Sequence, residues 1–270
     1  MSKFVGLSGL PRSGSTILSA ILDQNPLIHA EGNSAVCQFI WDMHRSGTVN
    51  ANEQLKGNNR EYVVQDLIAQ IPKIYYKDIA PTKQIIVDKC RSWTMADNVT
   101  LLQKYIDPAI KIIVLERSVT AIMKSFMKLY RKNNWNEAYI HSILKALLVP
   151  NAEPIMRSIS GINLAKKNNT ANTFLFIQYD DLIAQPAATF ERIYTFCGWE
   201  PFAHKFTEVV NAHPENDVFY KLDGFHTIRA TLSKEENDVL LPPDIAVKCQ
   251  QIDQLMGYNW YLKKLKHKNI

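Results

Sequence analysis

The N-terminal stretch of residues 4–18, which decides the fold, reads FVGLSGLPRSGSTIL. An apolar run typical of a strand leads into a glycine-rich turn, and Ile17, Leu18, Ile21 and Leu22 then fall on one stripe of a helix. In a strand, loop and helix arranged in this order, backbone N–H groups and the helix N-terminus converge on an anion. The stretch therefore predicts an anion-binding loop at the start of an α/β fold.

The loop has the spacing of a P-loop but lacks its lysine. Gly9 and Gly14 are spaced as Gly-x-x-x-x-Gly, and Thr16 has the place of the motif's hydroxyl. Ser15 stands where a nucleoside triphosphatase has the lysine that neutralises the β and γ phosphates. The loop's own cation is Arg12, whose guanidinium suits a phosphate or sulfate group. The alternative is an ordinary strand-to-helix turn in which serine and threonine side chains cap the helix.

Short β-branched runs alternate with helical patterns along the rest of the chain. Strands are predicted at 84–89, 111–117 and 173–179, with a further short strand within 27–34. Helices are predicted at 35–43, 60–71, 95–105, 118–130 and 187–197, with two more in 135–167 divided near Pro150, and a surface loop at 44–59. This alternation predicts a parallel sheet with right-handed crossovers, and the continuous apolar runs predict strands covered on both faces.

We therefore expect an α/β fold of three layers, a P-loop-type parallel sheet flanked by helices. The chain of 270 residues, 46% of them hydrophobic, suits a single domain over 1–270, with 135–167 as a helical insertion. The net charge of +5 fits a small anionic ligand and does not approach the clustered basicity of a nucleic-acid-binding protein. The basic run at 263–268 is expected to be a solvated tail, with contact to a membrane surface or an acidic partner as the alternative.

The four cysteines are scattered without a C-x-x-C pair. Their spacing predicts neither a zinc site nor a disulfide framework, so reduced thiols are expected, most of them buried. No apolar run approaches the length of about 20 residues that spans a bilayer, and no signal peptide precedes the first strand, so a cytoplasmic location is expected. A homodimer remains possible, because the sequence does not determine the oligomeric state.

Residues 11–18, PRSGSTIL, resemble the 5′-phosphosulfate-binding loop of the sulfotransferases that use 3′-phosphoadenosine 5′-phosphosulfate (PAPS). The form of the loop is closer to the tyrosylprotein and bacterial-type branches than to the cytosolic small-molecule branch. The resemblance implies PAPS as co-substrate, with no metal required. It also implies that the loop holds the phosphosulfate through Arg12, Ser13, Gly14, Ser15 and Thr16.

Further matches to that family follow later strands. Arg117 comes at the carboxyl end of the strand at 111–117, where ligands bind in α/β sheets, and Ser125 lies about two helical turns further on. In the family, an arginine and a serine with this spacing hold the 3′-phosphate of PAPS. Tyr179 resembles a family tyrosine beside the adenine or 3′-phosphate, and Arg229 lies in a segment that resembles the loop closing over PAPS. The alternatives are a surface ion pair for Arg117, a core role for Tyr179 and a solvated loop side chain for Arg229.

Sulfuryl transfer, like phosphoryl transfer, depends on positioning and on cations near the leaving oxygen. Arg12 is one such cation, and Lys89 is the other candidate, because it ends a strand at the rim of the loop and matches a catalytic lysine of the family. The alternative for Lys89 is a salt bridge at the strand end, with Asp88 as a possible partner. The base for the acceptor hydroxyl is predicted to be Glu31, with His29 as the alternative, although a gapless count from Arg12 reaches Asn33.

The sequence therefore predicts a PAPS-dependent sulfotransferase that acts on a hydroxyl or amine acceptor by in-line displacement. Two alternatives come from other classes. One is a P-loop kinase or nucleotide hydrolase with a degenerate Walker motif, against which Ser15 argues. The other is a non-catalytic nucleotide-binding protein. The acceptor is not identified by any pattern in the chain.

Overall fold

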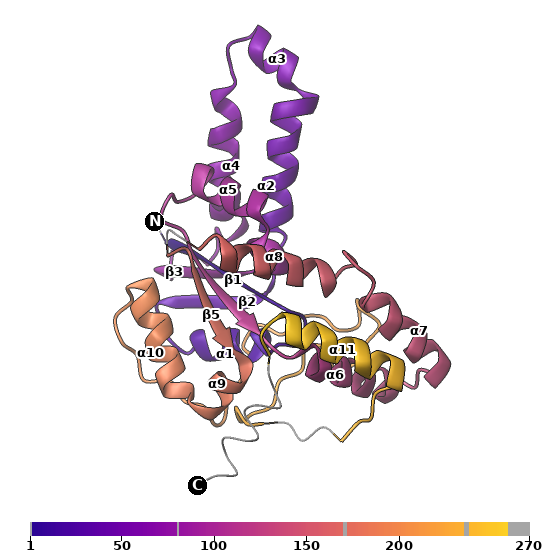
Figure 1. The fold of residues 1–270 in the computed structure, drawn as a ribbon. Coiled ribbons are helices and arrows are strands. Elements are labelled where there is room, and N and C mark those ends of the chain that lie inside the picture. The colour runs from indigo at the N-terminus through magenta and orange to yellow at the C-terminus, as the bar shows by residue number, and fades with distance from the viewer. Residues whose placement is uncertain (1, 80, 170–171, 235–237, 259–270) are drawn as a thin grey trace.

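The computed structural model describes residues 2–79, 81–169, 172–234 and 238–258. All strands pair in parallel in one sheet of order β2-β3-β1-β4-β5. These strands are β1 (Lys3–Gly9), β2 (Ile28–Asn33), β3 (Ile85–Lys89), β4 (Lys111–Glu116) and β5 (Phe174–Gln178). The N-terminal strand is thus central, between β3 and β4, so its loop opens at the middle of the sheet (Figure 1). The α/β fold with a parallel sheet is confirmed.

Successive residues of each strand face opposite sides of the sheet, because the side-chain period of a strand is two. In β4, Ile112 and Val114 belong to one hydrophobic core, whereas Ile113 and Leu115 belong to the other. All four side chains are fully buried. The unbroken apolar run in the sequence therefore reports a strand covered on both faces, as predicted.

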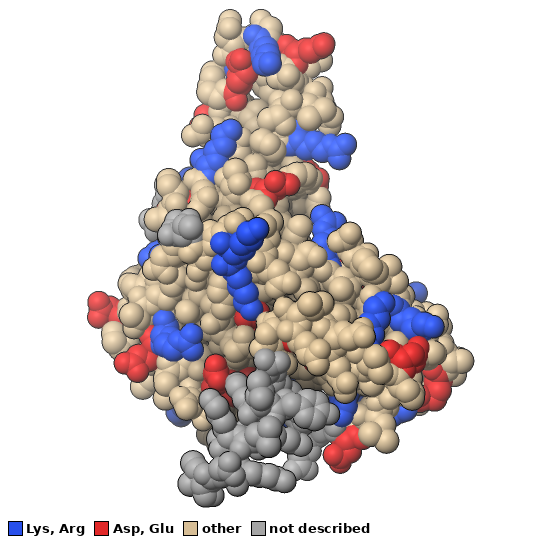
Figure 2. All heavy atoms as spheres, viewed as in Figure 1, with Lys and Arg blue, Asp and Glu red and all other residues tan. Residues whose placement is uncertain are grey.

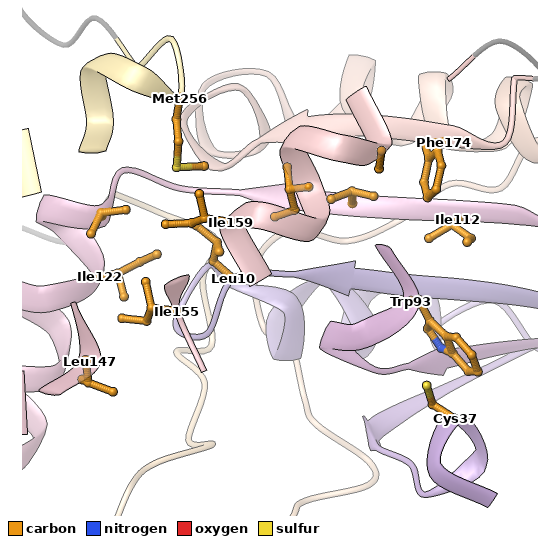
Figure 3. Packing of buried hydrophobic residues seen from close by; sticks show 14 of the residues in the cluster. Leu10, Cys37, Trp93, Ile112, Ile122, Leu147, Ile155, Ile159, Phe174 and Met256 are labelled. Atoms are coloured by element: carbon orange, nitrogen blue, oxygen red, sulfur yellow. The ribbon is translucent and has the colours of Figure 1, made fainter. Parts of the chain in front are cut away.

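Helices cover both faces and complete three layers. Three of them contribute to the core that contains Ile113: α1 (Ser15–Leu22), α9 (Tyr179–Ala184) and α10 (Pro186–Cys197). The core that contains Ile112, which also holds Leu10 and Trp93 (Figure 3), is covered by the others. These are α2 (Val36–Arg45), α4 (Tyr62–Tyr75), α5 (Ala96–Tyr105), α6 (Val119–Lys132), α7 (Glu137–Leu147), α8 (Met156–Lys167) and α11 (Pro243–Leu255), with the short 3₁₀ helix η2 (Arg91–Thr94).

The helices α2 and α4 extend away from the sheet as a hairpin (Figure 1). The surface loop predicted at 44–59 is only partly correct, because the π-helical turn η1 (Ser46–Asn50) and α3 (Asn52–Gly57) lie within it. The predicted end of the next helix at residue 71 is wrong, since α4 continues through Pro72 to Tyr75. Val64, Ile68 and Pro72 form one buried stripe with a spacing of four, so burial of the proline ring keeps it in the helix.

The segment between β4 and β5 contains α7 and α8, as predicted for 135–167. Helix α11, which packs on α6, was not predicted. Among the described residues, none of the helices combines the length and apolar character needed to cross a membrane.

Two further sequence features can be compared with the structure. All four cysteines are free, and Cys37, Cys197 and Cys249 are buried whereas Cys90 is half-buried. On the face drawn in Figure 2, lysine and arginine side chains are interspersed with aspartate and glutamate. The basic run at 263–268 lies outside the described residues.

Candidate active site

A cavity of about 210 Å³ lies where β1, β3 and β4 end. Most of the predicted site residues line it: Arg12, Gly14, Ser15, Thr16, Lys89, Arg117, Ser125, Tyr179 and Arg229. Two of the predicted residues, Ser13 and Glu31, are not part of the lining. The cavity also receives Phe225 and His226 from a segment that the motifs did not single out as catalytic. Residues more than 200 positions apart thus meet at the carboxyl edge of the sheet.

The glycine-rich loop leaves the first turn of α1 open to a ligand. Gly14 is the N-cap residue of α1, and no side chain of the described residues caps this helix, so the serine and threonine capping interpretation does not hold. Gly14 has φ +93°, and a Cβ there would lie 2.8 Å from a ring carbon of Tyr179. A side chain at this position would therefore strain the backbone and displace the tyrosine. The uncapped N–H groups and the helix dipole favour an anion at this point.

Arg12 connects the loop to α6 and to the loop after α10. Its Nε donates to Ser125 Oγ at 3.1 Å, one of its terminal nitrogens donates to the carbonyl oxygen of Phe225, and its guanidinium lies 5.8 Å from the Phe225 ring centre. The backbone of Arg12 is in the left-handed region, at φ 58°. The glycine-rich loop, α6 and the loop after α10 therefore meet at the Arg12 guanidinium at the edge of the cavity.

Arg117 is the second cation of this part of the cavity. A terminal nitrogen donates to the carbonyl oxygen of Arg12 at 2.8 Å, and the guanidinium lies 4.3 Å above the Tyr179 ring. The Nε atom is buried, and within the described residues it has no hydrogen-bond partner. A buried donor of a charged group is costly to leave unpaired. The donor set fits an oxyanion of a ligand, and the surface ion pair considered for Arg117 is not formed within the described part of the chain.

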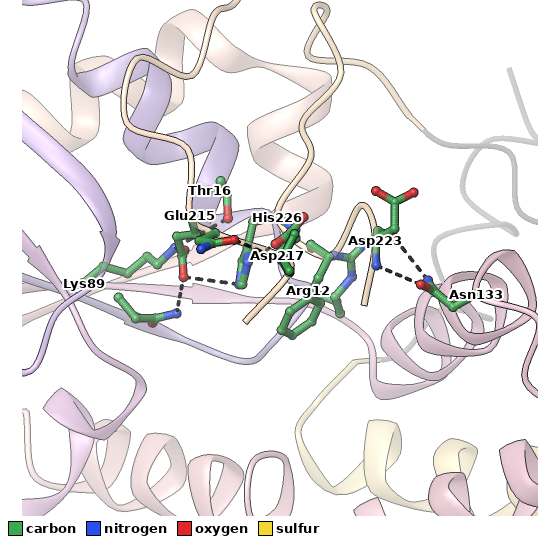
Figure 4. A network of polar contacts seen from close by, with 12 residues as sticks. Arg12, Thr16, Lys89, Asn133, Glu215, Asp217, Asp223 and His226 are labelled. Carbon is green, nitrogen blue, oxygen red and sulfur yellow. Dashed lines mark hydrogen bonds and ion pairs between the residues drawn. The ribbon is translucent and has the colours of Figure 1, made fainter. Parts of the chain in front are cut away.

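Lys89 ends β3 beside Leu7 of β1, and its side chain is 6% exposed. The Nζ atom lies 3.0 Å from Glu215 Oε1 and 3.5 Å from Thr16 Oγ1 (Figure 4). Burial lowers the pKa of the Lys89 ammonium below its ordinary value, whereas Glu215 acts in the opposite direction. The ammonium is therefore close to the start of α1, within the anion-binding part of the cavity.

The salt bridge considered between Lys89 and Asp88 is not formed. The Asp88 carboxylate accepts hydrogen bonds from Tyr76 Oη at 2.8 Å and from Trp93 Nε1 at 2.7 Å. Lys89 faces away because neighbouring strand residues alternate in direction. Asp88 therefore anchors core aromatic residues on the face opposite the cavity.

The sequence motifs missed an acidic and histidine cluster over Lys89. Glu215 Oε2 lies 3.4 Å from His226 Nε2, and His226 Nδ1 lies 2.7 Å from Asp217 Oδ1 (Figure 4). All three side chains are at least four-fifths buried. Burial lowers the pKa of His226, and the two carboxylates oppose this shift. Asp217 accepts from one ring nitrogen and so fixes which nitrogen faces the cavity.

The predicted base Glu31 lies outside the cavity lining, whereas Arg229, the predicted second ligand of the 3′-phosphate, lies in it. Glu31 Oε2 lies 3.1 Å from His29 Nε2, and His29 lowers the pKa of the Glu31 carboxyl. Asn33, which the gapless count reached, lines the cavity and donates to Glu215 Oε2 at 3.5 Å. Arg229 reaches the cavity and donates to the carbonyl oxygen of Ser233 at 2.6 Å.

The comparisons with known proteins agree in fold and family. A family model described as "Sulfotransferase family" matches residues 5–204. Similar solved structures include the sulfotransferase domain from the curacin biosynthetic pathway, with a TM-score of 0.56 and 16% identity over 95% of this chain and 98% of that one. The sulfotransferase domain of the Synechococcus PCC 7002 olefin synthase gives 0.54 and 19%, over 96% of both chains. Mouse sulfotransferase SULT7A1, complexed with PAP, gives 0.53 and 13%, over 96% of this chain and 85% of that one.

At these identities the solved structures establish a shared fold, and a search of curated proteins found no match. The family model is the stronger result, because residues 5–204 are 200 of the chain's 270 residues. It does not favour the kinase or hydrolase alternative. The chain belongs to the sulfotransferase family, and it is an enzyme of the type that transfers a sulfuryl group.

Proposed function

We propose that this enzyme transfers the sulfuryl group of PAPS to a hydroxyl or amine acceptor by in-line displacement in the cavity at the carboxyl edge of the sheet. The observation that carries the proposal is the meeting of Lys89 and Arg12 with the uncapped N-terminus of α1 in one cavity. This arrangement suits a single sulfuryl group more than a Mg²⁺-bound triphosphate, because the lysine position of the P-loop is Ser15.

The donor nucleotide would be held at its two charged ends. The loop amides, with the hydroxyls of Ser15 and Thr16, would bind the 5′-phosphosulfate. Arg117, Ser125 and Arg229 would bind the 3′-phosphate, and the unpaired Nε of Arg117 is the donor that supports this assignment. Tyr179 would fix the Arg117 guanidinium by stacking on it. The mouse structure that shares the fold contains PAP, which also supports a PAPS co-substrate.

Ser13 has a different role in this proposal. Its side chain is fully buried behind the loop, and its hydroxyl has no hydrogen-bond partner within the described residues. The backbone of the loop, rather than this hydroxyl, would therefore contact the phosphosulfate.

Lys89 would stabilise the charge that develops on the bridging oxygen of the leaving nucleotide. Arg12 would join it by exchanging its contacts with Ser125 and the Phe225 carbonyl for the phosphosulfate. As the acceptor oxygen forms its bond to sulfur, the bond between sulfur and the bridging oxygen breaks, and its electron pair stays on that oxygen. Lys89 would donate a hydrogen bond to it, which a buried ammonium does strongly. In the structure the same Nζ contacts Glu215, and because an ammonium has three N–H donors, Lys89 can keep this carboxylate while it donates to the nucleotide.

The acceptor proton needs a base, and the geometry favours His226 over Glu31 and His29. His226 lines the cavity, Asp217 orients it, and burial lowers the pKa of its imidazole, which favours the neutral form that a base needs. Glu31 does not line the cavity and is paired with His29. The proton would pass from the acceptor oxygen to Nε2, the ring nitrogen that does not face Asp217.

Three further expectations remain predictions. The whole chain is expected to act as one domain, with α7 and α8 as an insertion. A cytoplasmic location is consistent with four free cysteines, which are typical of a reducing compartment. A homodimer remains possible.

A sulfate-transfer screen tests the proposal. The enzyme is incubated with ³⁵S-labelled PAPS and a panel of phenols, sugars, lipid alcohols, amines and tyrosine peptides. We expect labelled product with at least one class, formed at least about 100-fold more slowly by the Lys89→Met variant. Nucleotide binding without product across the whole panel would support the non-catalytic alternative and contradict the proposal.

A further inference from the structure

A second cluster of ligand-type side chains lies outside the nucleotide cavity. Asp23 caps the C-terminus of α1, His29 is on β2, and His213 comes from the segment after α10. One ligand atom from each residue lies within 4.8 Å of the other two. Asp23 Oδ2 is 3.3 Å from His213 Nε2, and Asp23 Oδ1 is 3.8 Å from His29 Nδ1. The three side chains thus converge on one point from three parts of the fold.

The buried imidazole of His29 is poorly satisfied by the protein alone. The residue is 1% exposed, and its Nε2 has no hydrogen-bond partner within the described residues, although Glu31 Oε2 lies out of line at 3.1 Å. The other nitrogen, Nδ1, is too far from Asp23 for a hydrogen bond. Nδ1, which has no hydrogen-bond partner within the described residues, is the atom that faces Asp23 and His213, so an ion bound to Nδ1 would satisfy it and leave Nε2 facing Glu31.

The distances match a small tetrahedral metal site. Zinc bonds to nitrogen and oxygen of about 2.0–2.2 Å place neighbouring ligand atoms roughly 3.3–3.6 Å apart. The Asp23–His213 separation of 3.3 Å already has this spacing, the Asp23–His29 separation of 3.8 Å is slightly longer, and the two imidazoles, whose ligand atoms lie within 4.8 Å of each other, would draw together around the ion. Two imidazoles and one carboxylate favour a transition-metal ion over Mg²⁺ or Ca²⁺, which prefer oxygen ligands. The fourth position would open to solvent, because the His213 side chain is 39% exposed.

A second layer of contacts is also in place. Glu31 faces the ring nitrogen of His29 that would not bind the metal, which is the usual way in which a carboxylate orients a metal-binding histidine. Asp23 Oδ1 accepts the backbone N–H of Ala30 at 3.2 Å, which fixes the carboxylate.

We propose that Asp23, His29 and His213 bind one Zn²⁺ or a similar divalent transition-metal ion. The ion fastens the segment after α10 to the sheet and takes no part in the transfer chemistry. His213 is two residues before Glu215, so the ion holds the carboxylate that contacts Lys89 and steadies the segment that carries His226. The spacing of the ligands explains why no motif revealed the site, since His29 comes six positions after Asp23 and His213 comes 184 positions after His29.

Calorimetric titration of the chelator-treated full-length protein with ZnCl₂, in the absence of nucleotide, tests this proposal. We expect one equivalent to bind at micromolar concentration or tighter and to raise the thermal unfolding midpoint. Asp23→Asn and His213→Ala should each weaken binding at least tenfold. Asparagine still accepts the Ala30 N–H, and His213 is partly exposed, so both variants are expected to fold.

The matched control is His141→Ala, because His141 also pairs with an aspartate, Asp244 at 3.0 Å, but lies far from the cluster on exposed surface. It should bind zinc as the original chain does. No binding at 100 µM, or unchanged stoichiometry and affinity in His213→Ala, would overturn the proposal. A cobalt-loaded protein adds a second readout, since a thiolate charge-transfer band would place the metal on cysteine instead. Separate titration with 3′,5′-adenosine bisphosphate distinguishes failure of the metal site from failure of the nucleotide site.

Discussion

Replacing Lys89 by methionine separates the catalytic role of its ammonium from its structural one. Methionine keeps an unbranched side chain of similar length and removes the charge. The Lys89 side chain is 6% exposed and that of Glu215 is 11% exposed, so the substitution leaves a buried carboxylate without its closest cation.

Loss of one partner of a buried ion pair costs about 3–5 kcal/mol. The lower end applies here, because Glu215 retains a hydrogen bond from the Asn33 amide. About 3 kcal/mol corresponds to a fall of about 5 °C in the unfolding midpoint of a chain of this size. The catalytic loss is larger, since removal of one preorganised donor to a developing charge lowers kcat by about 100-fold to 1,000-fold.

The double variant Lys89→Met/Glu215→Gln distinguishes the two effects. Neutralising Glu215 removes the unpaired buried charge, so most of the lost stability should return, whereas kcat should stay at least about 100-fold low. Calorimetric unfolding and labelled-sulfate transfer at saturating PAPS measure the two quantities. Recovery of kcat in the double variant, or full activity in Lys89→Met, would refute the role given to the ammonium.

Three other predictions concern the loop and the titrating groups. Gly14→Ala should lower the free energy of unfolding by about 2 kcal/mol, because of the positive φ and the contact with Tyr179, and should abolish nucleotide binding. The control Gly57→Ala, where an added Cβ meets no atom within 4 Å, should change neither the unfolding free energy nor the binding measured by titration. Burial lowers the pKa of His226 below 6.5, so kcat should fall as the pH drops through that lowered value, and a pH profile of His226→Ala that keeps this limb would contradict the assignment. Burial also lowers the pKa of Lys89 below 10.5, so kcat should fall as the pH rises through the lowered value, and Lys89→Arg should move that limb to higher pH.

The sequence predicted the sheet well because the strands are buried on both faces. The run from Ile112 to Leu115 is unbroken and apolar, as expected of a strand in the middle of a three-layer fold. Predictions were poorer where tertiary packing overrides local signals. Pro72 predicts a helix end, yet its ring continues the buried stripe of α4. Helix α11 begins at Pro243 with Ile245, Cys249 and Ile252 on its buried side, a signal that was available but not used.

The candidate site was predictable where residues follow strands. Lys89 and Arg117 come directly at the ends of β3 and β4, so the topology alone places them at one edge. Glu215 and His226 lie in an irregular segment, where no periodicity predicts which side chain turns inward. Their positions depend on the fold of that segment across the cavity, which involves contacts between residues more than 100 positions apart, such as Lys89 with Glu215.

The most direct test of the central claim is equilibrium binding of ³⁵S-labelled PAPS, followed by displacement with unlabelled nucleotides. We predict saturable binding, displacement by 3′,5′-adenosine bisphosphate, and little displacement by Mg²⁺-ATP, which lacks the 3′-phosphate. Arg117→Ala should weaken binding about 30-fold, as expected for loss of a hydrogen-bonded charge contact of about 2 kcal/mol, whereas the exposed Arg157→Ala should not. Absence of saturable binding, or equal displacement by Mg²⁺-ATP, would contradict the account.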